Sequence, residues 1–142
     1  MVEGRRIIDA DGLILGRMAS IVAKRLLRGE RIEIVNAERA VISGRRLMVI
    51  EEWKDRLRLG GAGKGPIHYR RPNMILRRVI RGMLPYRSAH GREAFKRLRV
   101  HLGVPKELEG ADRESIPEAH VSRLRGRYVT LGEVAEQMGW RR

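Results

Sequence analysis

Residues 6–35 read RIIDADGLILGRMASIVAKRLLRGERIEIV and contain two short apolar strands separated by a helical pattern. The first strand is predicted at 6–10 and the second at 32–35, where β-branched residues dominate. Between them, apolar residues recur at helical spacing at Leu15, Met18, Ala19, Val22, Ala23 and Leu26. Gly29 is placed to end this helix. A strand, a helix and a second strand in series favour a right-handed parallel crossover.

Further short elements follow this unit. A strand is predicted at 40–42, closed by Ser43-Gly44, and a helix at 47–59. After a loop, helices are predicted at 72–84 and 91–98, followed by a strand at 99–102. Thr130 and Glu133 have the spacing of a capping box for a final helix that runs to Met138.

The composition is that of one folded domain over 1–142. Of the 142 residues, 42% are hydrophobic, which is enough for a single core. The chain has no cysteine, which excludes disulfides, thiol catalysis and cysteine-bound zinc. It shows neither a signal-peptide pattern nor an apolar run of about 20 residues, so the expected location is the cytoplasm.

Basic residues outnumber acidic ones by 31 to 17, and this net charge of +14 indicates a polyanionic partner, nucleic acid before an anionic membrane. Residues 54–101 carry fourteen Lys and Arg against two Asp and Glu, whereas 102–142 carry seven of each. The segment 54–101 is therefore predicted to face the partner, with 102–142 as a charge-balanced C-terminal extension. Aromatic residues make up only 4%, which argues against a surface that stacks single-stranded bases.

The predicted helix 72–84 has two chemically distinct faces. At about 3.6 residues per turn, Arg77, Arg78 and Arg81 fall within an arc of about 100°. The opposite arc holds Ile75, Leu76, Val79, Ile80 and Met83. An ordinary solvated face mixes in acidic residues, but these are absent from the whole of 57–91. The helix is predicted to pack its apolar arc in the core and to offer its arginines to anions.

The segment before this helix, 60–73, is a glycine-rich basic loop. It contributes Lys64, His68, Arg70 and Arg71. Glycines allow backbone amides and cationic side chains to approach phosphates without obstruction. The alternative is an ordinary surface loop, which can also become ordered on binding.

Two glycine motifs suggest nucleotide binding, but neither is complete. In Gly61-Ala62-Gly63-Lys64-Gly65, Arg58 takes the place of the first glycine of a phosphate loop, and Gly65 replaces the magnesium-binding Ser or Thr. Gly12 and Gly16 lack the dinucleotide spacing. The four histidines are too scattered for a metal site, and no serine has the setting of a nucleophile. We therefore predict no catalytic residue, no metal site and no cofactor.

The run Val79-Ile80-Arg81-Gly82-Met83-Leu84-Pro85 is similar to the signature of the large-subunit ribosomal protein L-thirteen family, which carries a closely similar Arg-Gly-Met-Leu-Pro. Other landmarks of the family agree in order and spacing: Asp9-Ala10-x-Gly12 with Leu15-Gly16-Arg17, Val35-Asn36-Ala37-Glu38 with Ser43-Gly44, and Gly91 through Leu102-Gly103-Val104-Pro105. Tyr128-Val129-Thr130-Leu131-Gly132 leading to Gly139-Trp140 resembles the archaeal branch. The resemblance covers nearly the whole chain.

The resemblance implies a fold and a role. The fold is α/β, a three-layer α/β/α arrangement on a small, mainly parallel central sheet of about four strands, with a basic helix-loop extension. The role is that of a structural constituent of the large ribosomal subunit and not of an enzyme. Its expected partners are folded large-subunit (23S-type) rRNA, which it binds and stabilises during subunit assembly, and neighbouring large-subunit proteins.

The predicted RNA-binding residues are the cations of the basic segment: Lys64, His68, Arg70, Arg71, Arg77, Arg78, Arg81, Arg87, His90, Arg92 and Lys96. Folded RNA is recognised largely through shape, phosphates and 2′-hydroxyls, which suits many arginines and few aromatics. Relatives tend to have Lys or Arg where this chain has His90. An imidazole is mostly neutral at pH 7, so a phosphate contact there is expected to be weaker.

Two other functions remain open on the sequence alone. The strand–helix–strand start suggests an α/β nucleotide-binding protein, although an intact phosphate loop and an acid–base pair are missing. The amphipathic helix 72–84 suggests a basic module on an anionic membrane surface, although the core needs the same apolar arc.

Overall fold

The computed structural model describes residues 4–58 and 69–141, in which five α-helices accompany a three-stranded sheet and a separate strand pair. The strands are β1 (Arg5–Asp9), β2 (Arg31–Val35), β3 (Val41–Ser43), β4 (Leu98–Val100) and β5 (Tyr128–Thr130). The helices are α1 (Leu15–Leu27), α2 (Arg46–Arg58), α3 (Pro72–Gly82), α4 (Ala89–Lys96) and α5 (Leu131–Gln137). Four short 3-10 helices are η1 (Ala37–Arg39), η2 (Lys106–Leu108), η3 (Pro117–Ala119) and η4 (Val121–Arg123).

The central sheet is parallel, with the strand order β1-β2-β4. The predicted β1–α1–β2 crossover, the α/β class and the mainly parallel sheet are confirmed. The strand predicted at 40–42 forms β3, which pairs antiparallel with β5 and does not join the parallel sheet. A further segment extends the edge of that sheet, because Glu114 forms an isolated parallel bridge with Ile8.

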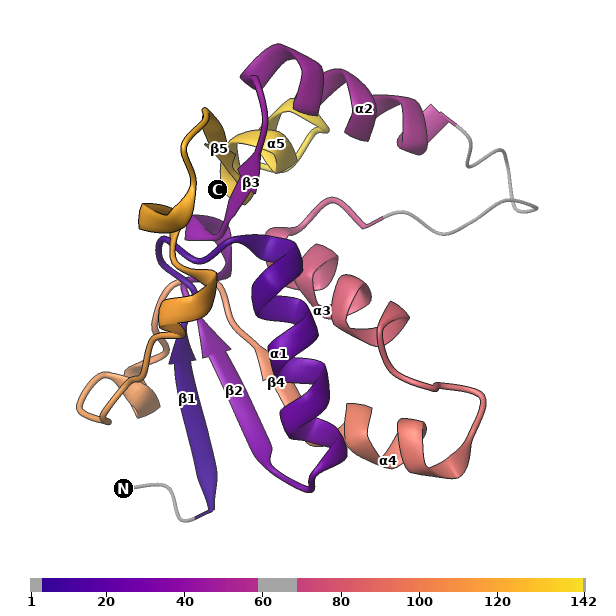
Figure 1. Ribbon diagram of the computed structural model, residues 1–142, viewed down its shortest axis with the longest axis vertical. Helices are drawn as coiled ribbons and strands as arrows, with labels where there is room; N and C mark the ends of the chain where they lie inside the picture. The colour runs from indigo at the N-terminus through magenta and orange to yellow at the C-terminus, as the bar shows by residue number, and fades with distance from the viewer. Residues whose placement is uncertain (1–3, 59–68, 142) are drawn as a thin grey trace.

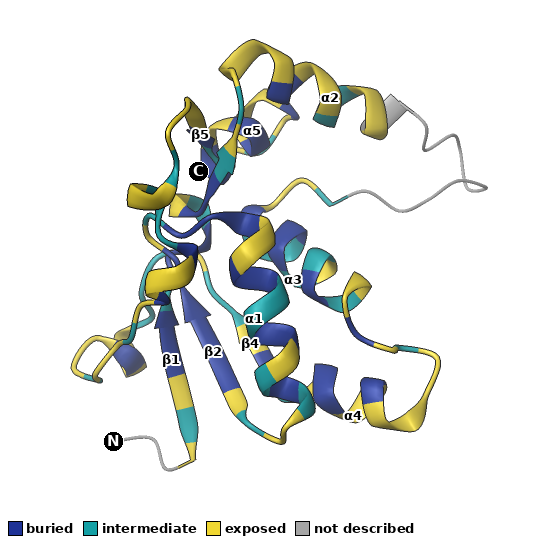
Figure 2. Ribbon diagram, in the orientation of Figure 1, coloured by how far each residue is buried: buried dark blue, intermediate teal, exposed yellow. Residues whose placement is uncertain are grey.

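One face of the sheet packs against helices. Four apolar strand residues that point to this face, Ile8, Ile32, Ile34 and Leu98, are buried. Helix α1 lies across them, and α3 and α4 pack against α1 beside β4 (Figure 1). All six apolar positions predicted for α1 are buried, so the helical spacing identified its inner face correctly (Figure 2).

The other face of the sheet is covered only in part, and by less regular structure than the three-layer expectation. Ile7 and Val35 pack there against Leu108 of η2, with Val104 and Ala111 beside them. This second, smaller core covers the carboxyl-terminal half of the face. The amino-terminal half carries polar residues, which include Arg5 and Glu33.

Several of the sequence landmarks meet at one corner, at the carboxyl ends of the strands. Asn36 has a left-handed backbone conformation with φ of 57°, and its side-chain amide donates to the Asp9 carboxylate at 3.0 Å. The Asn36 backbone amide donates to the Gly103 carbonyl at 2.8 Å. The Gly103 amide in turn donates to the Glu38 carboxylate at 3.0 Å. These bonds tie β1, β2 and the loop after β4 together.

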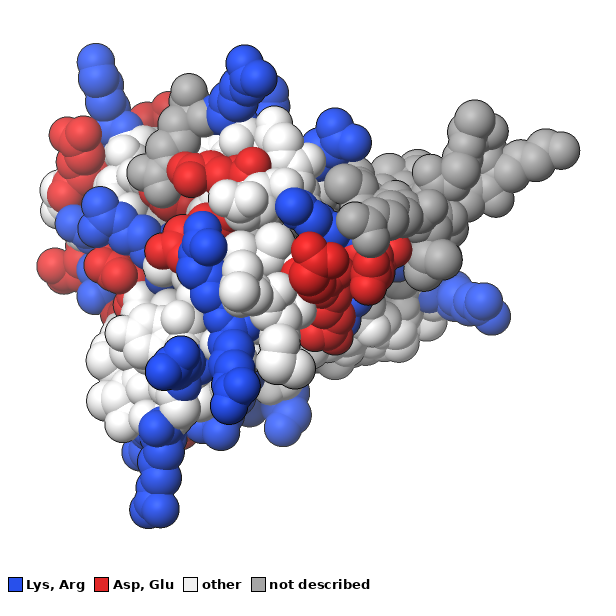
Figure 3. All heavy atoms as spheres, turned by 90° about the horizontal axis from the view of Figure 1, so that it is seen from above, with Lys and Arg blue, Asp and Glu red and all other residues white. Residues whose placement is uncertain are grey.

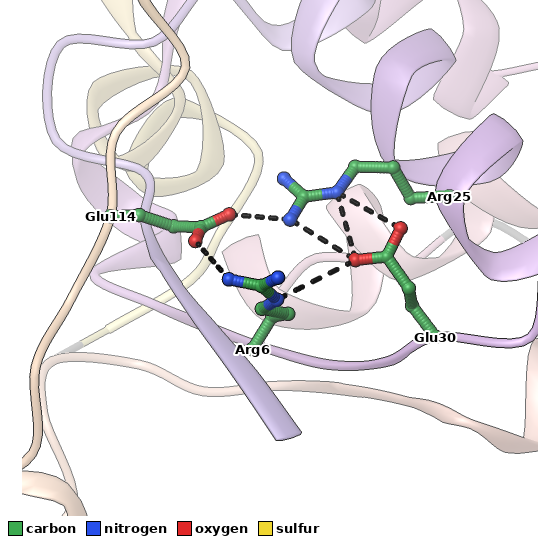
Figure 4. A network of polar contacts seen from close by, with 4 residues as sticks. All are labelled: Arg6, Arg25, Glu30 and Glu114. Carbon is green, nitrogen blue, oxygen red and sulfur yellow. Dashed lines mark hydrogen bonds and ion pairs between the residues drawn. The ribbon is translucent and has the colours of Figure 1, made fainter. Parts of the chain in front are cut away.

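An ion-pair network holds the C-terminal segment on the sheet (Figure 4). Glu114 accepts from Arg6 and Arg25, and both arginines also reach Glu30. Burial opposes the charge on Arg25, but its hydrogen bonds to Glu30 and Glu114 prevail and raise its pKa above the ordinary value. The network therefore joins β1 and the end of α1 to a segment about 90 to 110 residues further along the chain.

Helix α3 buries the apolar arc that the sequence predicts, with one exception. Ile75, Leu76 and Ile80 are at most 4% exposed, and Val79 is half-buried. Met83 was predicted on the same arc, but 43% of it is exposed, so this assignment is wrong. The helix ends at Gly82, and Met83 therefore lies in the following turn, beyond the last residue that points into the core.

The turn from α3 to α4 depends on a close backbone approach at Gly91. The Ser88 hydroxyl donates to the Pro85 carbonyl at 2.8 Å and accepts from the Gly91 amide at 3.1 Å, which caps α4. A Cβ atom on Gly91 would overlap the Pro85 carbonyl group. Glycine at this position therefore allows α4 to pack against the end of the Gly-Met-Leu-Pro run.

Replacing Ile80 with Asp is expected to lower the free energy of unfolding by several kcal/mol, about 3–5, because a carboxylate would be buried without a partner. The matched control is Met83→Asp, which adds the same charge to an exposed side chain and should cost less than about 1 kcal/mol. Urea unfolding followed by circular dichroism measures both values. Equal losses would mean that the core-facing side of α3 has been misassigned.

Replacing Gly91 with Ala should lower the free energy of unfolding by about 1–3 kcal/mol, because the added methyl must displace the Pro85 backbone or α4. Gly110→Ala is the control, since a Cβ atom there has no neighbour within 4 Å and the backbone φ is not positive. This change should be neutral or slightly stabilising. A neutral Gly91→Ala would show that the turn can shift at no cost.

Candidate nucleic-acid interface

The arginines of α3 lie opposite its buried arc. Arg78 is exposed, whereas Arg77 and Arg81 are half-buried. The reason is geometric: with Ile75, Leu76 and Ile80 turned into the core, residues 77, 78 and 81 must lie on the outer side of the helix. The structure thus brings these three predicted residues together on one surface.

Two of these guanidinium groups stack on aromatic rings. Arg77 lies 4.2 Å from the centroid of the Phe95 ring, and Arg81 lies 4.1 Å from that of Tyr86. The two rings meet edge to face, with their centroids 5.6 Å apart. A stacked guanidinium is oriented by the ring but keeps its N–H groups for other acceptors, and each stack contributes about 0.5–1 kcal/mol.

A groove runs beside these residues. We call it the α3 groove; it has a volume of about 680 Å³. It is lined by Arg78, Arg81, Gly82, Leu84, Pro85, Tyr86, Arg87 and Ser88. In the described part of the chain, none of the arginines at 77, 78, 81 and 87 forms an ion pair with a carboxylate. The groove therefore presents cationic groups that the protein itself does not neutralise.

The other predicted cations have different positions. Arg92 donates to the Arg87 carbonyl at 2.8 Å and to the Tyr86 carbonyl at 3.4 Å. These bonds hold the turn between α3 and α4 against α4. His90 is exposed in the first turn of α4. Lys96 pairs with Glu93 at 3.4 Å and lines a separate hollow beside the sheet. Arg92 and Lys96 thus contribute less directly to the groove than the sequence suggests.

The basic loop before α3 is described only at its end. Arg70 and Arg71 are exposed, and the Arg70 guanidinium lies beside Gly139, after α5. Lys64 and His68 lie outside the described residues. Of the cations predicted in this loop and in α3, Arg70, Arg71, Arg77, Arg78 and Arg81 are described, and Arg77, Arg78 and Arg81 share one face.

Sequence reasoning missed the aromatic residues that position the arginines. Tyr86 and Phe95 were not assigned any role, yet they hold Arg81 and Arg77. The sequence offered one signal: the chain has only one Phe and three Tyr, and two of these four follow α3 closely, Tyr86 in the turn and Phe95 in α4.

Charge is arranged differently at the end of the molecule formed by α2 and α5. Viewed from that end, basic and acidic side chains are interspersed (Figure 3). Arg46 pairs with Glu133 at 3.6 Å, and Arg56 pairs with Glu52 at 3.3 Å. These two arginines have carboxylate partners, unlike those of the α3 groove.

The residues that the structure describes contain neither a metal site nor a membrane-spanning helix. Among them, no group of three or more His, Asp or Glu side chains is placed to hold a metal ion. None of the helices in 4–58 and 69–141 is both long enough and apolar enough to cross a membrane.

The chain matches the family model described as Ribosomal protein L13 over residues 4–107. The large ribosomal subunit protein uL13 of Methanopyrus kandleri is 50% identical over 137 residues, which cover 94% of this chain and 86% of that protein. The protein of the same name from Archaeoglobus fulgidus is also 50% identical, over 95% of this chain and 88% of its own length. That of Aeropyrum pernix is 45% identical over 98% of this chain and 93% of its own length.

The family model spans well over half of the chain, and archaeal relatives match it along nearly its whole length. The resemblance carried by the Arg-Gly-Met-Leu-Pro run is therefore confirmed. The chain belongs to the ribosomal protein L13 family.

Proposed function

We propose that this protein is a structural component of the large ribosomal subunit that binds folded rRNA through the α3 groove and the surrounding cations. The observation that carries the proposal is the set of arginines at 77, 78, 81 and 87, which share one surface and have no carboxylate partner among the described residues. The family consists of structural, non-enzymatic ribosomal proteins. The archaeal relatives named above are large-subunit proteins.

The chemistry of the groove suits a phosphate backbone. Arginine offers a planar fork of N–H donors that matches phosphate oxygens, and its charge persists at all physiological pH values. The stacks on Phe95 and Tyr86 orient two of these forks before RNA arrives. Preorganised donors lose less conformational entropy on binding than freely rotating side chains do.

The structure also bears on the two alternatives. The apolar arc of α3, through Ile75, Leu76 and Ile80, is buried in the protein core and is not available to a bilayer. At the turn between β1 and α1, the Ile14 amide donates to the Ala119 carbonyl at 2.7 Å, and Val121 bonds to the Gly12 carbonyl. Residues of the C-terminal segment thus occupy the place where α/β proteins bind a dinucleotide phosphate.

The triple change Arg77/Arg78/Arg81→Ala should leave a folded protein whose affinity for large-subunit rRNA falls roughly tenfold to a hundredfold, at about 0.5–1 kcal/mol per charged contact. The matched control, Arg45/Arg125/Arg127→Ala, removes three exposed arginines near β3 and β5. Cosedimentation of tagged protein with large subunits measures incorporation, and a thermal melt verifies folding. Equal losses in both triples would mean that only total charge matters. No loss in the first would place the RNA surface elsewhere.

Binding to large-subunit rRNA should weaken steeply as salt rises, because each neutralised phosphate releases bound counterions. Five or six contacts predict a slope of log K against log salt of magnitude at least about 4, at roughly 0.7–0.9 per contact. A filter-binding titration at constant magnesium measures it. A slope near zero would contradict an electrostatic interface.

A further inference from the structure

A second basic surface lies on the half of the sheet that the described residues leave uncovered. It includes a hollow of about 300 Å³ at the amino-terminal ends of the strands, where Arg5, Arg31 and Arg99 lie on the face turned away from α1. Its cations come from β1, β2, β4 and the end of α4, and they are Arg5, Arg31, Lys96, Arg97 and Arg99. We call this the open-sheet surface. It is separate from the α3 groove, with which it shares no lining residue.

The register of the strands places these arginines side by side on neighbouring strands. Arg5 of β1 is paired with Arg31 of β2. Ile32 is paired with Leu98, so Arg97, the residue before β4, lies beside Arg31. In the next row on the same face, Arg99 is paired with Glu33. Neighbouring strands are only about 4.8 Å apart, and like charges placed side by side on them destabilise a sheet.

The one carboxylate buried in this surface is already neutralised. Glu33 is 5% exposed; one carboxylate oxygen lies 2.9 Å from Arg5 and the other 2.8 Å from His101. Burial opposes its ionisation, but the hydrogen bonds from His101 and Arg5 hold the pKa of Glu33 below its ordinary value. Glu33 is thus a charged partner of Arg5, and no carboxylate in the described part of the chain forms an ion pair with Arg31, Arg97 or Arg99.

Those remaining arginines include two that are free to bind. Arg97 donates to the Leu26 carbonyl at 2.6 Å and is anchored by it, and Lys96 pairs with Glu93. Arg31 and Arg99 are exposed, and their side chains form no hydrogen bond or ion pair with any residue that the structure describes. Leu108 covers the apolar half of this face, and the basic half is left open by the residues in 4–58 and 69–141.

We infer that the open-sheet surface binds a second segment of rRNA backbone, distinct from the segment that occupies the α3 groove. The inference rests on the proposed function, since it takes rRNA to be the partner. Charge complementarity identifies the occupant: the juxtaposed arginines repel one another until an anion lies between them, and a polyphosphate chain neutralises several at once. The protein would then bridge two RNA segments, one on each side of the α4 helix.

The test uses the full-length chain bound to purified large-subunit rRNA and hydroxyl-radical footprinting of the RNA backbone. Arg31→Ala/Arg99→Ala should remove one set of protections and keep those that depend on the α3 groove. Arg77/Arg78/Arg81→Ala should do the reverse. The first variant should also weaken binding about fivefold to thirtyfold, and lower the magnitude of the salt slope by about 1.5 for its two lost contacts.

Controls separate this inference from the proposed function. Arg31→Lys/Arg99→Lys keeps the charge and should keep the protections, and a thermal melt of each variant verifies folding. If Arg31→Ala/Arg99→Ala keeps every protection, or loses only those lost by the α3 triple, the second site is refuted while the proposed function stands. If the unmodified protein gives no protections, the proposed function fails, and this inference fails with it. If the surface instead crosslinks to a protein in intact subunits, its occupant is not RNA.

Discussion

Ile75, Leu76 and Ile80 fill the space between α1 and β4, and this packing determines the rotation of α3 about its own axis. Burial of each such side chain contributes about 1.5–3 kcal/mol, so any rotation that exposed them would be strongly unfavourable. The arginines on the opposite side have their directions set by the same packing. The end of α3 then positions Pro85, against which Gly91 and α4 pack. The arrangement of cationic groups outside is therefore a consequence of apolar contacts inside.

The arginines of this molecule occur in three kinds of environment. At the end formed by α2 and α5, and around Glu114, carboxylates neutralise the cations. On α3, aromatic rings hold the guanidinium groups and leave their charge in place. On the open half of the sheet, Arg31 and Arg99 have neither kind of partner among the residues that the structure describes. A carboxylate in the last two places would compete with phosphate for the same N–H donors, whereas an aromatic ring does not.

The parts of the fold that could be predicted are those with a long local pattern. The thirteen residues of α1 carry enough repeats of helical spacing to identify every buried position, and the flanking strands follow from their β-branched residues. β3 was recognised as a strand, but its partner β5 is three residues long and far away in sequence, so no local pattern relates the two. Met83 was misassigned because helical periodicity was extended one residue beyond the end of α3.

The same limit applies to the candidate site. Arg77, Arg78 and Arg81 were found because they share one helix, whereas Arg5, Arg31 and Arg99 become neighbours only through the register of three strands. Their assembly into one surface depends on tertiary structure, which single-strand patterns do not reveal. The RNA-binding roles assigned to the predicted cations all remain predictions, and Lys64 and His68 also lie outside the described residues.

The pairing of β3 with β5 has a consequence for the order of events during synthesis. Val41 pairs with Thr130, 89 positions later in the chain, so this two-stranded ladder cannot form until Thr130 has been synthesised. Closing so large a loop is slow compared with forming the β1–α1–β2 unit, whose contacts are local. Translation proceeds from the N-terminus, so the parallel sheet and α3 can assemble while the last residues are still inside the exit tunnel. The lobe built from α2, β3, β5 and α5 can form only after almost the entire polypeptide has been made. Formation of this lobe is therefore expected to be the last step in the folding of the chain.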